Sequence, residues 1–220
     1  MPFSLKMKAW FTGEDKKMVR RLLQLYVGLG LYGLSTTMFI RSDLGLDPWD
    51  VFHLGVAIQL GLSIGMVIIL TGAAVLLLWI PLRQMPGLGT LSNVIIIGLA
   101  ADASMALIPE VTSLPLRIAL LVAGIVVNAI ATGMYIGAGF GAGPRDGLMT
   151  GIHARMGWSI RSVRTSIEVS VLLIGCMLGG TFGIGTVAYA LTIGPLIQIC
   201  LPLFRYKPRV EKTPQPERVV

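Results

Sequence analysis

Two short segments hold the residues best suited to binding a charged ligand or moving a proton, each with an aspartate close to a proline. They cover residues 45–50 and 143–146. In the first segment Asp47, Pro48 and Asp50 occupy the N-cap, first and third positions of a predicted helix, all of which favour helix initiation. Asp50 is expected to return a bond to the backbone. In the second segment a glycine takes the place of the cap.

The charged side chains of these segments are the first candidates for a site. Asp47, Asp50 and Asp146 are candidates for proton or cation coupling or for contact with a substrate amine, and Arg145 is a candidate for neutralising an anionic group. Aspartates at such positions also serve as plain caps of turns at a membrane surface. The sequence leaves both interpretations open for Asp50 and for Asp146.

Three further polar residues within apolar stretches are candidates for the same path: Asp102, Asn128 and Glu168. A carboxylate in hydrocarbon is costly, so each acidic residue needs either a functional role or a partner. Arg164 lies one helical turn before Glu168 and is its simplest partner. Glu168 is therefore either part of a structural ion pair or a cavity residue.

No pattern in the sequence indicates catalysis or a bound metal. His53 and His153 are expected to be hydrogen-bonded helix residues, because no cluster of His, Cys and carboxylates has metal-ligand spacing. The sequence contains neither a phosphate-binding P-loop nor a nucleophile elbow. We therefore expect no cofactor, no metal site, no catalytic residue and no enzymatic activity.

The composition excludes a water-soluble globule. Of the 220 residues, 54% are hydrophobic and 13% are charged, and the mean hydropathy is +0.78, whereas soluble domains contain about 25% charged residues. The two cysteines, Cys176 and Cys200, lie in apolar runs and are expected to pack rather than to form a disulfide. The predicted fold class is an all-α polytopic membrane protein.

Six apolar stretches are long enough to cross a bilayer about 30 Å thick, which takes roughly 20 helical residues. They cover residues 22–40, 64–83, 89–108, 117–139, 160–180 and 184–203. The connectors 41–63 and 140–159 are apolar over too short a length to cross. Each is predicted to contain a short broken or re-entrant helix that begins at Pro48 or Pro144, since proline ends a preceding helix yet starts a new one well.

The chain matches itself at a constant offset. Pro48 and Pro144 are 96 positions apart. The same offset relates Asp50 to Asp146, and further matches are Gly45/Gly141, Gly55/Gly151, Gly89/Gly185 and Ile97/Ile193. A set of matches without gaps indicates a duplication. With three spans in each half, the second half must be inverted relative to the first.

These observations divide the chain into four parts. Residues 21–116 form the first membrane repeat and residues 117–204 the second. Residues 1–20 are a basic segment predicted to be cytoplasmic. Residues 205–220 are a cytoplasmic tail predicted to be disordered.

The distribution of lysine and arginine sets the predicted orientation. The connector 140–164 contains four arginines, whereas its counterpart 44–68 contains no lysine or arginine. The arginine-rich connector and both termini are therefore placed in the cytoplasm, with Arg41 and Arg117 on the opposite side. The basic termini indicate contact with the lipid bilayer rather than with nucleic acid, because no nucleic-acid-binding motif lies between them.

The sequence resembles a known bacterial family. Residues 32–35, 45–51 and 141–147, which read Tyr-Gly-Leu-Ser, Gly-Leu-Asp-Pro-Trp-Asp-Val and Gly-Ala-Gly-Pro-Arg-Asp-Gly, are similar to those of YczE/YitT-type integral membrane proteins. No long soluble C-terminal domain of the YitT kind follows, which favours the YczE branch. The resemblance covers about residues 20–205 and implies a multi-pass protein of the bacterial cytoplasmic membrane, without naming a substrate.

A small secondary transporter or exporter-like permease fits these observations best, with a central site between the two helices broken at Pro48 and Pro144. Its substrate is unknown, and no ATP-binding motif supplies energy. A passive channel also suits two opposed half-helices, and a non-transporting scaffold or accessory protein is a further alternative. The sequence leaves open whether the chain forms a homo-oligomer.

The inverted arrangement predicts that residues 61 and 157 face opposite sides of the membrane. Single cysteines introduced at these positions, in a chain with Cys176 and Cys200 replaced by serine, should react with an impermeant thiol reagent from opposite sides of intact cells. Labelling of both positions from the same side would contradict the inversion.

Overall fold

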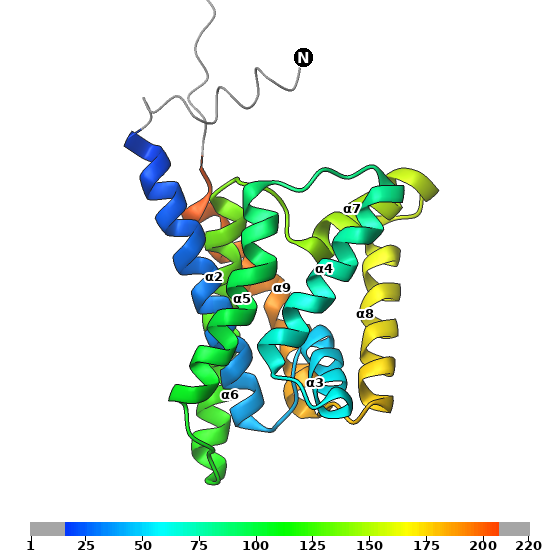
Figure 1. Ribbon diagram of the computed structural model, residues 1–220. Coiled ribbons are helices and arrows are strands. Elements are labelled where there is room, and N and C mark those ends of the chain that lie inside the picture. Colours follow the sequence, from blue (N-terminus) through cyan, green and yellow to red (C-terminus); the bar gives the residue numbers. More distant parts are fainter. Residues whose placement is uncertain (1–15, 207–220) are drawn as a thin grey trace, which may run out of the picture.

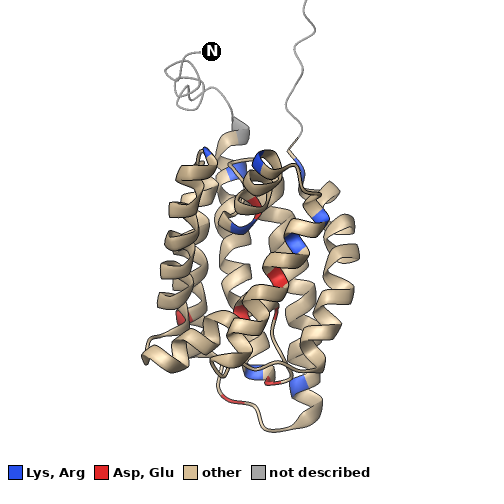
Figure 2. Ribbon diagram, turned by 90° about the vertical axis from the view of Figure 1, so that its right-hand side faces the viewer, with Lys and Arg blue, Asp and Glu red and all other residues tan. Residues whose placement is uncertain are grey.

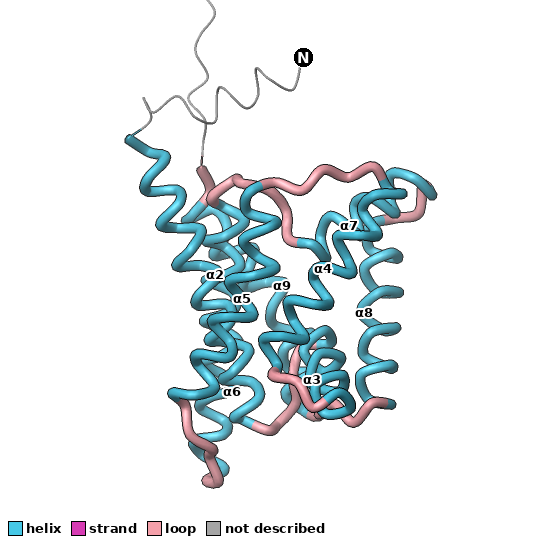
Figure 3. The backbone as a smooth tube through the Cα atoms, in the orientation of Figure 1, coloured by secondary structure: helices cyan, strands magenta, loops and turns pink. Residues whose placement is uncertain are grey.

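The described part of the chain is entirely helical. A computed structural model describes residues 16–206 as eight α-helices, and this part contains no strand (Figures 1 and 3). The predicted terminal segments lie largely outside it, in residues 1–15 and 207–220. The helices are α2 (Lys16–Ser42), α3 (Pro48–Leu60), α4 (Ile64–Leu82), α5 (Leu88–Leu107), α6 (Leu114–Gly137), α7 (Pro144–Met156), α8 (Ile160–Met177) and α9 (Ile184–Phe204).

Five of these helices are long and apolar enough to cross a membrane: α2, α4, α5, α6 and α9. Their outer faces carry exposed apolar side chains such as Leu77, Ile80 and Leu191, which lipid accommodates and water does not. The chain is therefore a polytopic membrane protein. The sixth predicted span corresponds to α8, which carries Arg161 and Arg164 as well as Glu168 and is less apolar.

Two helices begin at the predicted prolines and are short. Helices α3 and α7 start at Pro48 and Pro144 and have 13 residues each, which gives a length of about 20 Å, less than the apolar core of a bilayer. They lie at opposite ends of the bundle (Figure 1). Both end at a glycine with positive φ, so the neighbouring exposed residues Leu62 and Trp158 are better positions for the labelling cysteines.

The helices pack as two groups of four, each drawn from both halves of the chain. The long-helix group consists of α2, α5, α6 and α9, with α2 packed on both α5 and α6, and α9 packed on α6. The half-helix group consists of α3, α4, α7 and α8, with α3 packed on α8 and α4 packed on α7. The packing of α4 along α5 joins the two groups.

Helices α2 and α6 satisfy the C-terminal carbonyls of each other. The Nε of Arg21, on α2, donates to the carbonyl of Ala138 at the end of α6 (2.9 Å). The Nε of Arg117, on α6, donates to the carbonyl of Ser42 at the end of α2 (2.6 Å). The last carbonyls of a helix have no partner within it and favour a nearby cation. This exchange accounts for the central pairing of the long-helix group.

The same rule explains the two arginines that charge counting places on the opposite side of the membrane. Arg117 also pairs with the carboxylate of Asp43 (2.6 Å). Arg41 donates from Nη2 to the carbonyl of Met105 near the end of α5 (2.9 Å). Both side chains therefore donate to carbonyls at or near the ends of helices. This capping role explains their positions, which the count of charges on the two sides of the membrane does not.

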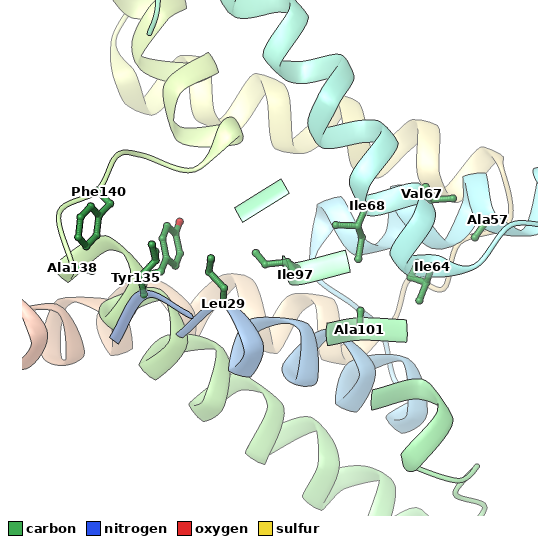
Figure 4. Packing of buried hydrophobic residues seen from close by; sticks show 11 residues of the cluster. Leu29, Ala57, Ile64, Val67, Ile68, Ile97, Ala101, Tyr135, Ala138 and Phe140 are labelled. Atoms are coloured by element: carbon green, nitrogen blue, oxygen red, sulfur yellow. The ribbon is translucent and has the colours of Figure 1, made fainter. Parts of the chain in front are cut away.

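An apolar core runs through both groups (Figure 4). It includes Leu29, Ile68, Ile97 and Tyr135, which come from α2, α4, α5 and α6. Because these helices belong to both halves of the chain, neither half buries this core alone. The two halves are expected to fold as one cooperative unit.

Close contact between α4 and α5 depends on two glycines. A Cβ on Gly98 would clash with the carbonyl oxygen of Gly65 and lie 2.7 Å from Ile69. Asp102 closes the same contact, because its carboxylate accepts from Gly65 N (2.8 Å) and from the hydroxyl of Ser63 (2.6 Å) at the start of α4. The two helices therefore touch backbone to backbone.

The matching pair in the second half is separated. Among the described residues, α8 does not pack along α9 as α4 packs along α5. A Cβ on Gly194, which stands 96 positions after Gly98, would meet nothing within 4 Å. The position equivalent to Gly65 is Arg161, which is exposed. The fold is thus closed between α4 and α5 and open between α8 and α9.

The replacement Gly98→Ala should destabilise the protein by about 1–3 kcal/mol, because the added methyl group overpacks a contact with backbone on one side. The matched control is Gly30→Ala on α2, where a Cβ would meet nothing within 4 Å and the loss of a helical glycine should be stabilising. Thermal unfolding in detergent compares the two. Equal midpoints would show that the α4–α5 contact is not tight.

Candidate functional site

A cavity of about 230 Å³ lies between the two helix groups. Residues from all eight described helices line it. The first turns of both short helices contribute to its wall, with Pro48 and Trp49 from α3 and Pro144, Arg145 and Asp146 from α7. The two segments therefore line one cavity, in the place of the predicted central site between the helices that begin at Pro48 and Pro144.

Asp47 caps α3 from within the protein. Its Oδ1 accepts hydrogen bonds from the backbone N–H groups of Trp49 (2.8 Å) and Asp50 (2.9 Å), which confirms the predicted N-cap. The residue is only 2% exposed, so it caps the helix from inside the protein. Its second oxygen, Oδ2, is buried and has no hydrogen-bond partner, although an unpaired buried acceptor is costly.

Asp50 turns away from the backbone that it was expected to cap. Its Oδ2 accepts from the hydroxyl of Thr36 on α2 (2.9 Å), and its Oδ1 lies 3.1 Å from Nδ1 of His53. All three side chains are fully or almost fully buried. His53 is thus a hydrogen-bonded helix residue, as predicted, and its partner is a candidate site residue.

The positively charged side chain of Arg145, in the second half of the chain, lies near the carboxylates of Asp47 and Asp50 in the first half. Its Nη1 lies 3.8 Å from Oδ1 of Asp47, and its Nη2 lies 3.9 Å from Oδ1 of Asp50. The guanidinium carbon also lies 4.8 Å from the centre of the Trp49 ring, within the range of a cation–π contact. The arginine side chain remains 30% exposed.

The first turn of α7 is stabilised differently. Its N-cap is Gly143, which offers no side chain. Asp146 accepts a hydrogen bond from the hydroxyl of Tyr135 (3.1 Å), and the carbonyl of Pro144 accepts one from Nε1 of Trp79 (3.0 Å). Tyrosine and tryptophan from neighbouring helices therefore hold this turn in place.

The remaining candidates are distributed unevenly. Asn128 is fully buried and bridges two helices, because its amide donates to Ser35 (2.9 Å) and accepts from the hydroxyl of Tyr189 (3.1 Å). Glu168 pairs with Arg164 (2.8 Å), and both line the cavity, so the two alternatives for Glu168 are compatible. Asp102 is not part of the cavity wall; it binds the first turn of α4.

Several residues of the site were not among the predicted ones, although the repeat contained a signal for them. Tyr189 and Tyr135 line the cavity, and Thr36 binds Asp50. Polar residues occupy both members of three pairs separated by 96 positions, and each pair contributes to the cavity wall or to its hydrogen bonds: Tyr32/Asn128, Thr36/Thr132 and Asn93/Tyr189. These three pairs therefore gave a signal for the cavity, although the pair Asp102/Gln198 is also polar in both halves and lies outside the cavity wall.

The chemistry of the site is that of charge binding. Within residues 16–206, no group of three His, Cys, Asp or Glu side chains is arranged to hold a metal ion. Three carboxylates and one arginine lie at the first turns of the short helices, beside tyrosine and tryptophan rings. Such a cavity suits a small charged ligand with an apolar part.

Comparison with known proteins identifies the family. Residues 19–202 match the model of a family described as a family of unknown function, DUF6198. The chain belongs to this family. No solved structure matches it.

Similar proteins occur in two bacteria. The chain is 39% identical over 186 residues to an uncharacterized protein of Haemophilus influenzae, covering 84% of this chain and 85% of that protein. It is 31% identical over 189 residues to the uncharacterized membrane protein YczE of Bacillus subtilis, covering 85% and 88%. It is 26% identical over 185 residues to YyaS of the same organism, covering 81% and 92%. The predicted resemblance to the YczE branch is confirmed.

The hydrogen bond from Thr36 to Asp50 predicts a stability effect. Thr36→Val keeps the shape of the side chain but leaves a buried carboxylate oxygen without its donor, which should cost about 1–3 kcal/mol. Thr165→Val, at an exposed position on α8, should change stability by less than about 0.5 kcal/mol. Thermal unfolding in one detergent measures both. Equal stability of the two variants would show that Thr36 does not support Asp50.

Proposed function

We propose that the protein is a small secondary transporter of the bacterial cytoplasmic membrane, with its substrate site in the cavity between the two helix groups. The position of the cavity carries this proposal. A charged site enclosed between two groups of helices becomes accessible from either side when the groups rock against each other. The proposal includes no enzymatic step and no cofactor.

An inverted repeat supports this mechanism. Helices α3, α4 and α5 begin at residues 48, 64 and 88, and α7, α8 and α9 begin 96 positions later, at residues 144, 160 and 184. The arginines of α2 and α6 make the same contact in exchange, since Arg21 and Arg117 are also 96 positions apart, as are Ser42 and Ala138. This arrangement supports the proposal of six crossings with two re-entrant half-helices.

The charge distribution supports an orientation with both termini in the cytoplasm. Lys and Arg residues gather at the end of the bundle where α2 begins and α9 ends (Figure 2). Under the positive-inside rule this end faces the cytoplasm. In this orientation α3 lies at the outer end of the bundle and α7 at the cytoplasmic end (Figure 1).

The difference between the halves supports alternation between two states. The helices α4 and α5 touch through Gly65 and Gly98, whereas α8 and α9 are apart at Gly194. In an inverted repeat, the opposite state exchanges these arrangements, with α8 closing on α9 and α4 leaving α5. The cavity would thereby open toward the other side of the membrane.

Transport by the purified, full-length protein in liposomes tests the proposal. Amino acids, small peptides and cations are screened with and without a pH gradient. Accumulation against a concentration gradient, driven by the pH gradient, is the expected result. Downhill flux alone would indicate a passive channel, and absence of flux together with a co-purifying partner would indicate a scaffold.

Removing the charge of Asp50 or of Asp146 should abolish or uncouple transport, because each aspartate lies in the first turn of a short helix beside the cavity. Asp50→Asn and Asp146→Asn keep the size of the side chain and should leave the amount of protein in the membrane unchanged. Flux driven by the pH gradient should fall at least about tenfold, the loss expected when a charge that couples proton and substrate is removed. Glu110→Gln, at a residue whose side chain is 88% exposed, is the control and should transport normally. Normal transport by both Asn variants across a pH series would reduce these aspartates to caps.

A further inference from the structure

The geometry around Arg145 points to the class of ligand. We propose that Asp47, Asp50 and Trp49 form a binding site for a small organic cation with a guanidinium or amine group, and that Arg145 occupies this site as a tethered substitute when no ligand is bound. This inference rests on the proposed function, since it names the substrate class of the same cavity.

The hydrogen bonds of the site are incomplete in a way that a cationic donor would correct. Arg145 stands 3.8 and 3.9 Å from the two carboxylates, beyond hydrogen-bond distance, and among the described residues its guanidinium donates no hydrogen bond. Asp47 Oδ2 lacks any donor although the residue is 2% exposed and lines the cavity. A ligand with several N–H donors could approach closer than the tethered arginine and supply the missing bond.

The aromatic residues of the wall favour the same class of ligand. The guanidinium carbon of Arg145 already lies over the Trp49 ring, 4.8 Å from the ring centre. The rings of Tyr32, Tyr135 and Tyr189 line the same cavity. Aromatic rings bind ammonium and guanidinium groups through their negative faces. The site therefore has both the carboxylates and the aromatic surfaces that recognise an organic cation.

The volume limits the size of the ligand. At about 30 Å³ for each water molecule in the liquid, a cavity of about 230 Å³ has room for a ligand of roughly eight non-hydrogen atoms. A short alkyl guanidine or diamine is of this size.

Arg145 is able to leave the site. Its side chain is long and 30% exposed. It stands in the first turn of α7, which follows two glycines with positive φ, Gly139 and Gly141. A cation that binds the carboxylates more closely can therefore displace it without breaking a hydrogen bond.

The balance of charge favours a cation over an anion. At the starts of the short helices, Asp47 and Asp146 line the cavity with the single guanidinium of Arg145, and Asp50 lies behind the wall, 3.9 Å from that guanidinium. The other arginine of the wall, Arg164, is already paired with Glu168 at 2.8 Å. An anionic ligand would meet a net negative wall.

Chemical rescue of Arg145→Ala tests the inference. The full-length variant is purified in detergent, and its unfolding midpoint is measured with methylguanidinium chloride and with methylurea, which has nearly the same shape and no charge. Removing Arg145 leaves two carboxylates uncompensated, so the midpoint should fall, and methylguanidinium at millimolar concentration should restore it while methylurea should not. Arg161→Ala, an exposed arginine of α8 outside the cavity wall, is the control and should show no rescue.

Binding of agmatine, a guanidinium with an amine tail, gives the second measurement. If Arg145 occupies the site about nine-tenths of the time, its removal should strengthen agmatine binding about tenfold. Asp47→Asn keeps a good cap and should lose agmatine binding in the otherwise unaltered protein, which provides a test even where Arg145→Ala does not fold.

Three results would overturn the inference: rescue by methylurea as effective as rescue by methylguanidinium, unchanged agmatine binding in Asp47→Asn, or stabilisation of the unaltered protein by formate that is lost in Arg145→Ala. The last would identify an anion site. Binding is measured without transport, so cation binding in a protein without flux would refute only the transporter. Flux of other substrates without cation binding would refute only the cation site.

Discussion

The first turn of α3, which begins inside the protein at the buried residue Asp47, is the constraint on which the rest of the structure depends. The first N–H groups of a helix have no partner within it, and Asp47 satisfies two of them with one oxygen. A buried carboxylate in turn requires positive charge. That charge comes from Arg145 of α7. The residue that caps α3 therefore also contacts the second half of the chain, at the cavity.

The contacts between helices of the two halves follow from the same need to give every buried polar group a partner. Carbonyls at the ends of α2 and α6 are satisfied by Arg117 and Arg21 of the partner helix. Each half therefore depends on the other both at the helix ends and in the half-helix group, where α3 packs on α8 and α4 on α7. The cavity is lined by helices of both halves. The difference between the α4–α5 and α8–α9 contacts gives the proposed rocking motion its direction.

Much of this architecture could be predicted because apolar length and proline position act locally. The six predicted apolar stretches coincide with six of the helices within a few residues, and Pro48 and Pro144 begin α3 and α7. The prediction for Asp50 was wrong in detail, because Thr36 and His53 offer its carboxylate better partners than the backbone does. Arg117 remained unexplained until the end of α2 was seen beside it.

The sequence by itself determined the membrane as solvent and the residues at which the two short helices begin, and it predicted the duplication, since composition, proline and repetition are read from the chain alone. Only the tertiary structure decided that Asp102 binds the start of α4, that Asp47 and Asp50 face Arg145 from the other half, and that α8 stands apart from α9. These are contacts between residues about 40 to 100 positions apart. Their partners are set by how helices pack, a choice that local spacing does not encode.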